Sequence, residues 1–440
     1  MFMFRIVFIL FFSFNLVFLA EAKDRQTNNS AIAQNILRNH QDDIHLKNLL
    51  EKLLSQNPEI KSLSYKIAAA KNSVSQAPWL DDLTVGIDAV NLPTGNPSLS
   101  RTPMSGVQIS AQQKVPFPSK LITKKRIAKA KLGAVQKAYL ENINQLITKF
   151  KQSYYEYAYT QAAIYVHGKN KKRLIALKTI LQAKYTTGAI PLQDLLKIKI
   201  SIGDIDNSLI ALRQLSKTHQ VRLNTYLSQN IHDKINYSTK RKLSPLPKDM
   251  DKLVLKSKTA RPWLQKLDYD VQEKQKVQSL AKQSLLPDFN FKASYRVRNN
   301  VAGDPVNGEN FVSSGVSVNL PFLWSLPKHT KKISETKNLL RAKKHEKQAV
   351  AQEVKYQVSQ YYLDAKRLKK QYYITSGKIV PASKAAFNSS KSSYEAGEVD
   401  FLDVITAQNS LFSHELSSIR YKYDYEIKHA LLEMAVGEFF

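Results

Sequence analysis

Tyr185-Thr186-Thr187-Gly188, with Asp194-Leu195-Leu196 after it, returns as Tyr394-Glu395-Ala396-Gly397, with Asp403-Val404-Ile405 after it, 209 residues further along the chain. Two other pairs keep this offset: Pro78 with Pro287, and Gly106-Val107 with Gly315-Val316. Because the matching segments also keep their order, they indicate two copies of one structural unit and not chance matches in a lysine-rich chain.

Each copy has the same order of elements: helix, strand, strand, long helix, turn, helix. We expect a first repeat over residues 46–230, with strands at about 80–90 and 105–115. A linker over 231–250 is marked by Ser244-Pro245-Leu246-Pro247. The second repeat then covers 251–440, with strands at about 288–298 and 311–320. Alternation predicts these strands, and it is cleanest where Phe289, Phe291, Ala293, Tyr295 and Val297 share one face.

The long helices are expected at about 119–184 and 328–393. The first contains no proline and its apolar residues step by three and four, the rhythm of a coiled coil. At about 1.5 Å per residue such a helix spans ~100 Å, which requires supercoiled neighbours. Pro381 is expected to kink the second, and one further helix is expected over about 251–285.

Residues 1–22 are typical of a secretory signal, with Arg5 before an apolar stretch and Ala20-Glu21-Ala22 as the cleavage site. A leader over 23–45 follows. The alternative is an uncleaved anchor, but 14 apolar-region residues span only ~21 Å against the ~30 Å of a bilayer core. Since no later stretch has 18 apolar residues, an exported soluble protein and an outer-membrane β-barrel both remain open.

Composition excludes several classes of protein. The chain has no cysteine, so a disulfide framework, a lipid-anchored amino terminus and cysteine metal sites are excluded. The net charge of +30 raises nucleic acid as a partner, but the export signal and the scattered lysines argue against it. The charge indicates either solvated helix surfaces or attraction to anionic lipid headgroups or to an acidic partner.

Four amphipathic strands cannot close a barrel by themselves, and their edges must pair. Three chains would supply twelve strands. In its duplicated plan, its long helices and its four strands, the chain resembles the TolC family of outer-membrane efflux channels, from about Leu46 to Gly437. The resemblance implies a mainly α-helical trimer with a 12-stranded outer-membrane barrel and a periplasmic helical tunnel. It also implies a periplasmic adaptor (membrane fusion) protein and an inner-membrane pump of the RND type as partners.

Within that family the chain looks like the heavy-metal efflux branch, the CzcC- and CusC-like proteins. This likeness rests on the strand-to-helix segment that ends in Pro116-Phe117-Pro118-Ser119-Lys120. That branch has glycine-lysine after the last proline, where this chain has Ser119-Lys120. Heavy-metal cations are therefore a candidate cargo.

The resemblance also assigns roles to the duplicated turns. Tyr394 and Asp403 match a tyrosine and an aspartate of the closed periplasmic entrance, and Tyr185 and Asp194 are their counterparts in the first repeat. The turns at Gly188 and Gly397 match the periplasmic tips, where the adaptor is expected to dock. The chain departs from the family at two gate positions, where it has Val399 and Thr406. Asp194 and Asp403 from three chains would form rings of six carboxylates that concentrate cations. The alternative is that each Asp only charges the first turn of its helix.

Lys292, Arg296 and Arg298 lie on the polar face of one strand and are candidate lumen-lining residues. They would either bias conduction toward anions or serve as ordinary polar lining. The nine histidines are scattered, no metal-ligand spacing occurs, and no catalytic constellation is present. We therefore predict no cofactor and no enzymatic activity.

The sequence predicts an exit duct that passively conducts solutes from a pump and adaptor to the outside. Two alternatives remain: the exit duct of a type I protein-secretion system, and a soluble periplasmic coiled-coil scaffold.

Overall fold

The structure, a computed structural model, describes residues 43–238 and 242–438. The expected signal peptide and nearly all of the leader lie outside the described residues. The chain divides into two units, each built from both repeats. The sheet unit contains Ser64–Tyr139 and Pro262–Ala351. The helical unit contains the described residues through Leu63, Leu140–Arg261 and those from Gln352 onward.

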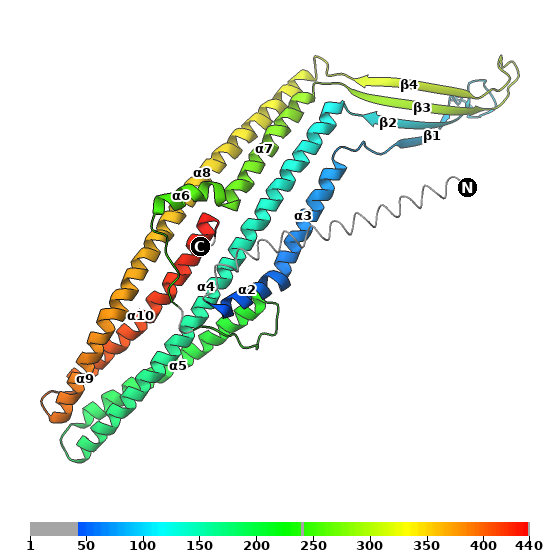
Figure 1. Ribbon diagram of the computed structural model, residues 1–440. Helices are drawn as coiled ribbons and strands as arrows, with labels where there is room; N and C mark the ends of the chain where they lie inside the picture. The colour runs from blue at the N-terminus through cyan, green and yellow to red at the C-terminus, as the bar shows by residue number, and fades with distance from the viewer. Residues whose placement is uncertain (1–42, 239–241, 439–440) are drawn as a thin grey trace. The chain divides into compact units, whose positions relative to one another are not determined.

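The sheet unit is organised around four antiparallel strands in the order β1-β2-β3-β4 (Figure 1). They are β1 (Thr84–Val90), β2 (Gly106–Val115), β3 (Asp288–Arg298) and β4 (Phe311–Asn319). The central pair joins the two repeats, with Ile109 opposite Tyr295. β1 and β4 are therefore the edge strands. At one end of the sheet, short connecting segments join all four strands to helices.

Four helical segments belong to this unit: most of α3 (Pro58–Gln76), α7 (Pro262–Gln283), and the first parts of α4 (Pro118–Thr186) and α8 (Leu326–Ile374). Helices α4 and α7 approach closely at Gly133, where a Cβ would lie 2.4 Å from the ring of Tyr269. At the start of α4, Lys120 Nζ donates to Asp288 Oδ1 at 2.7 Å and to the carbonyl of Leu286 at 2.8 Å. This contact ties the first turn of α4 to the start of β3.

The helical unit holds the rest of α4 and α8, together with the remaining helices. These are α2 (Ile44–Gln56), α5 (Leu192–Tyr226), α6 (Met250–Ala260), the π-helical turn η1 (Thr375–Ile379), α9 (Val380–Ala396) and α10 (Phe401–Val436). The predicted long helix at about 119–184 is confirmed. The core of the helical unit is a row of buried side chains. It includes Phe150 and Tyr154 of α4 and Val354 and Val358 of α8. None of the helices in the described ranges combines the length and apolar composition that a membrane crossing requires.

The structure corrects the helix predicted over about 251–285, which is interrupted at Arg261 by Pro262. A proline disfavours helical conformation in the preceding residue, and Arg261 is extended, with φ −64° and ψ 116°. The Asn57-Pro58 break in the first repeat is its counterpart, with φ −61° and ψ 125° at Asn57.

Both breaks are anchored in the same way. The side chain of Asn57 donates to the carbonyl of Tyr226 at 2.8 Å, and that of Arg261 donates to the carbonyl of Met434. Tyr226 is the last residue of α5 and Met434 lies in the last turn of α10, so both are near the end of the last helix of their repeat, 208 residues apart. Arg261 is buried and also pairs with Glu141 at 2.7 Å, which satisfies its charge. The duplication is therefore visible in tertiary contacts as well as in sequence.

Pro381 produces a local change of helix type. It lacks an N–H group and its ring would crowd the carbonyl four residues earlier, so the α-helical pattern cannot continue through it. The structure accommodates this with η1, where the N–H of Val380 donates to the carbonyl of Thr375, five residues back. The expected disturbance at Pro381 is thus a π-helical turn.

Candidate entrance and pore sites

The two duplicated turns share one backbone geometry in the helical unit. Gly188 has φ +72° and Gly397 has φ +83°, the left-handed conformation that favours glycine. After α4, the N–H of Ala189 donates to the carbonyl of Lys184 at 2.9 Å. After α9, the N–H of Glu398 donates to the carbonyl of Ser393 at 2.8 Å. Each bond closes the end of a long helix and reverses the chain into the next.

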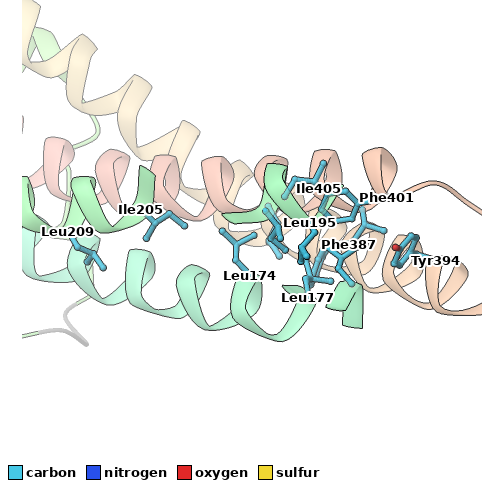
Figure 2. Close-up of a cluster of buried hydrophobic side chains, with 13 residues drawn as sticks. Leu174, Leu177, Leu195, Ile205, Leu209, Phe387, Tyr394, Phe401 and Ile405 are labelled. Atoms are coloured by element: carbon cyan, nitrogen blue, oxygen red, sulfur yellow. The ribbon is translucent and has the colours of Figure 1, made fainter. Parts of the chain in front are cut away.

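Each turn joins two helices into a helical hairpin, α4 with α5 and α9 with α10. A cluster of buried side chains packs these two helical hairpins against each other (Figure 2). It draws on α4, α5, α9 and α10 and consists of Leu174, Leu177, Leu181, Leu195, Ile198, Ile205, Leu209, Phe387, Tyr394, Phe401, Val404, Ile405 and Leu411. Fully burying a leucine or phenylalanine side chain is worth about 1.5–3 kcal/mol. Within one chain this apolar cluster therefore holds the hairpins together.

Tyr394 is part of this cluster, while its counterpart Tyr185 is exposed. The ring of Tyr394 meets that of Phe401 edge to face at 6.1 Å. Lys184 Nζ lies 4.5 Å from the Tyr394 ring centroid and donates to the Tyr394 carbonyl at 2.7 Å. Burial, and then the negative charge of Asp194, raise the pKa of the Tyr394 hydroxyl above 10.0. Tyr394 is therefore neutral and lies beside Asp194.

The two aspartates of the predicted entrance are in different environments. Both occupy the first turn of their helices, α5 and α10, and neither is the N-cap. The Asp194 side chain is only 19% exposed and its Oδ1 lies 3.5 Å from Lys197 Nζ. Asp403 is exposed on α10, and it forms no ion pair within the described residues. Of the two carboxylates, Asp403 is therefore the one that is open to solvent.

Sequence reasoning missed several cations that join the repeats in the helical unit. Lys184 is one of them, as described above. Another is Arg173 of α4, which forms a two-pronged ion pair with Glu415 of α10, with N–O distances of 2.7 and 2.8 Å. Lys169 adds a third bond to Glu415 at 3.0 Å. Because the partners are more than 200 residues apart, spacing along one sequence carries no signal of either contact.

The sheet presents two faces of opposite character in the sheet unit. Along β3 the apolar face has Phe291, Tyr295 and Val297, each close to half exposed. The neighbouring strands place apolar residues in register with them, such as Ile109 opposite Tyr295 and Val316 opposite Phe291. No described segment covers this face, so it is a continuous exposed apolar surface.

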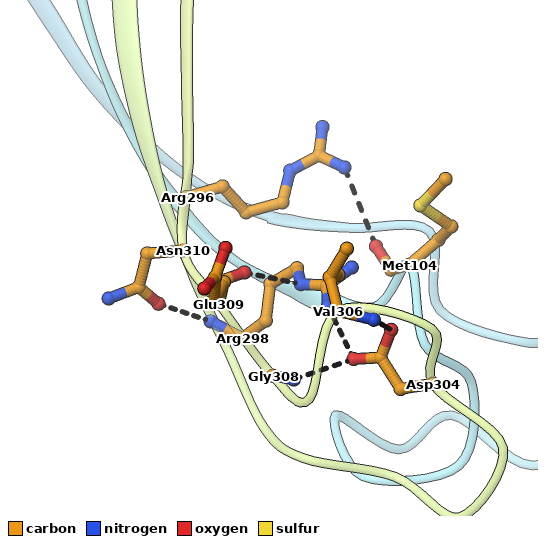
Figure 3. Close-up of polar contacts among 8 residues, drawn as sticks. All are labelled: Met104, Arg296, Arg298, Asp304, Val306, Gly308, Glu309 and Asn310. Atoms are coloured by element: carbon orange, nitrogen blue, oxygen red, sulfur yellow. Dashed lines mark hydrogen bonds and ion pairs between the residues drawn. The ribbon is translucent and has the colours of Figure 1, made fainter.

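The three cations predicted to line a lumen differ in accessibility, and Figure 3 shows two of them, Arg296 and Arg298. Lys292 is exposed, and Arg296 donates from Nη2 to Gln108 Oε1 at 2.9 Å across the β2–β3 pair. Arg298 is only 6% exposed and its guanidinium pairs with Asp304. Asp304 also accepts the N–H of Gly308 at 2.8 Å, so Arg298 anchors the β3–β4 loop. This role differs from the prediction of an open lining residue.

The described residues, 43–238 and 242–438, include no group of three or more histidine, cysteine, aspartate or glutamate side chains that could hold a metal ion.

Comparison with known proteins agrees with this architecture. Residues 254–438 match the family model described as outer membrane efflux protein. No curated protein matches the chain by sequence. The outer-membrane channel OprN aligns with a TM-score of 0.76 at 15% identity, covering 90% of both chains.

Two further solved structures are similar. CusC aligns with a TM-score of 0.76 at 12% identity, covering 90% of this chain and 92% of CusC. VceC, an outer membrane protein of Vibrio cholerae, aligns with a TM-score of 0.75 at 14% identity, covering 90% of this chain and 97% of VceC. By sequence, residues 254–438 thus match the outer membrane efflux protein family, and the fold of these channel structures extends over 90% of the chain.

Proposed function

We propose that this chain is the outer-membrane exit duct of a tripartite efflux system, through which solutes pass without chemical change. The observation that carries the proposal is the sheet, which has one exposed apolar face, one polar face and two unpaired edges. Such a surface is unstable in water but fits a wall between lipid and a water-filled lumen.

The open edges argue for a trimer. β1 and β4 each present a row of backbone groups that must be paired inside a membrane. If β4 of one chain pairs with β1 of the next, three chains close twelve strands and leave no edge. The apolar face then meets lipid, while Lys292 and Arg296 line the lumen.

The helical unit supplies the entrance in this proposal. Asp403 and Asp194 from three chains would surround the opening, with Tyr394 and Tyr185 beside them. The turns at Gly188 and Gly397 would dock a periplasmic adaptor, which connects the duct to an inner-membrane pump of the RND type. If Gly397→Pro leaves adaptor binding and efflux intact, the docking role is wrong.

Heavy-metal cations are the cargo class that we propose. The identity with CusC, 12%, is no higher than with OprN, 15%. The heavy-metal branch therefore rests on the Pro116-Phe117-Pro118-Ser119-Lys120 junction alone. Efflux of metal ions by cells that lack and regain this chain tests the cargo, and a secreted protein as the rescued cargo would instead indicate a type I secretion duct.

The decisive experiment is single-channel recording of the purified protein in a planar bilayer, together with extraction of native membranes by urea. A duct gives discrete conductance steps and stays in the membrane in urea. Folded protein that gives no steps and is washed off by urea would overturn the proposal in favour of a periplasmic scaffold.

A further inference from the structure

The sheet unit contains a second surface feature at the end where the strands join the helices. Trp79 lies five residues before β1, and Trp324 lies five residues after β4. By the register of the strands, both sit at the helix-side end of the sheet. Trp79 is 76% exposed and Trp324 is 80% exposed. Only three tryptophans occur in the chain, so two of them are exposed at this one level.

An indole is large and amphipathic, and it is enriched where an apolar phase meets water. Trp324 contacts the ring of Phe322, with centroids 4.4 Å apart, and Leu323 between them is also exposed. The exposed apolar face of the sheet is therefore followed, at its helix-side end, by an aromatic rim made of Trp79, Phe322 and Trp324. Such a rim is expected at the level of a membrane–water interface.

Cations follow directly after the rim. Residues 118–139 of α4 contain seven lysines or arginines and no aspartate or glutamate. Some lysines and arginines of this segment and of the start of α8 are exposed and form no ion pair in the described part of the chain, and we call this set the basic collar. The collar consists of Lys124, Lys125, Arg126, Lys129, Lys328, Lys331 and Lys337.

The collar differs from α7 of the same unit, where several lysines lie beside carboxylates. In α7 of the same unit, Lys266 pairs with Asp270 at 2.7 Å, and Lys274 lies 3.6 Å from Glu273. The collar has no such partners among the described residues. Asp81 and Asp82 are exposed acidic residues near the rim, and Glu335 of α8 is paired with Lys332, so a large excess of positive charge remains there.

We propose that the basic collar binds the phosphates of anionic lipid headgroups on the periplasmic surface of the outer membrane. At about 1.5 Å per residue, Lys129 and Lys337 lie ~17 Å along their helices, and the other members lie closer to the rim. Long cationic side chains reach toward an interface, and charge acts over about 8 Å at physiological salt. The collar residues are divided between α4 and α8. A lipid surface beside the rim contacts both helices, so it accounts for this distribution. The inference rests on the proposed function, since it needs the sheet to be in a membrane.

The test uses the full protein added to two kinds of vesicle, phosphatidylcholine alone and phosphatidylcholine with about a third phosphatidylglycerol. Urea-resistant insertion into each is measured, with conductance of the inserted protein. The collar variant is K124Q/K125Q/R126Q/K129Q. The matched control is K172Q/K199Q/R213Q/K217Q, which removes three lysines and one arginine that are exposed and unpaired in the helical unit.

Each cation near an anionic surface contributes several-fold in affinity, so the wild-type preference for anionic vesicles is expected to exceed that of the collar variant by at least about tenfold. The control keeps the wild-type preference, and both variants conduct normally once inserted. Equal loss in both variants would show a general charge effect and overturn the proposal. An unchanged preference in the collar variant would also overturn it and redirect the collar to an acidic protein. Failure of the wild type to insert in either vesicle would instead contradict the proposed duct itself.

Discussion

Gly397 and Gly168 offer the same substitution with opposite expected effects. A Cβ at either meets nothing within 4 Å, so only backbone conformation decides the outcome. Gly397→Ala forces an L-residue to φ +83°, which costs about 1–2 kcal/mol. Gly168→Ala replaces a glycine inside α4 and stabilises by roughly 0.5–1 kcal/mol. Thermal melts of the detergent-solubilised protein should shift down for the first and up for the second, and shifts of one sign would contradict this account.

Glu415 is expected to make stability depend on pH. Burial opposes its ionisation, but the hydrogen bonds from Arg173 and Lys169 outweigh burial and hold its pKa below the ordinary 4.5. A group whose pKa is lowered by folding stabilises above its unfolded pKa, and that contribution is lost as pH falls through the folded value. At pH 7 Glu415→Gln should therefore cost about 1.5–3 kcal/mol.

The deficit of the Glu415→Gln variant should shrink as the pH falls below about 4.5, because the wild type loses the same charge. Melting temperatures recorded from pH 7 to acid measure this. Glu395→Gln is the control, since Glu395 is 45% exposed and its exposed pair with Lys391 is worth at most about 1 kcal/mol. A deficit of Glu415→Gln that stays constant with pH would refute the assignment.

Among the elements, η1 has a packing role that can be tested. Buried Thr375 and Phe387 are twelve residues apart, whereas three α-helical turns take about eleven. The extra residue in the π-helical turn therefore keeps Phe387 on the inner face. Deleting Gly377 together with Pro381→Ala should give a continuous α-helix in the same register.

We expect that deletion variant to assemble and to bury Phe387 as before. Deleting Lys366 is the contrast, because it lies between buried Ala365 and Leu368 and no extra residue there can absorb the shift. Chemical labelling of a cysteine placed at position 387 would report which variant keeps that face inside. Equal labelling of both variants would show that register does not pass through η1.

The sequence was most informative where each residue has to satisfy one fixed environment. Strand β3 coincides with its alternation because the two faces of the sheet meet different surroundings. Helix ends were harder to predict. The break at Arg261 follows from Pro262, although one continuous helix was expected over this segment. Contacts between distant segments, such as Arg173 with Glu415, depend on the tertiary fold. For the same reason the sequence did not predict that Arg298 is buried and pairs with Asp304.

For the whole molecule, the difference between Asp194 and Asp403 predicts unequal effects on conduction. Asp403 is exposed, while the charge of Asp194 is offset by Lys197. In planar bilayers, Asp403→Ala should reduce cation selectivity more than Asp194→Ala. Both should leave the step size of the open sheet-lined pore close to wild type. A larger effect of Asp194→Ala would place the constriction on α5.

The pairing of β2 with β3 has a consequence for how the protein is made. Ile109 and Tyr295 are partners in the centre of the sheet but are about 186 residues apart. At roughly 5–20 residues per second, the first hairpin waits about 10–40 s for its neighbour to be synthesised. During that time an apolar β-hairpin stands with an unpaired inner edge, the arrangement most prone to aggregate. Biogenesis of this chain therefore calls for a holding chaperone that acts on the first hairpin before the second half has emerged.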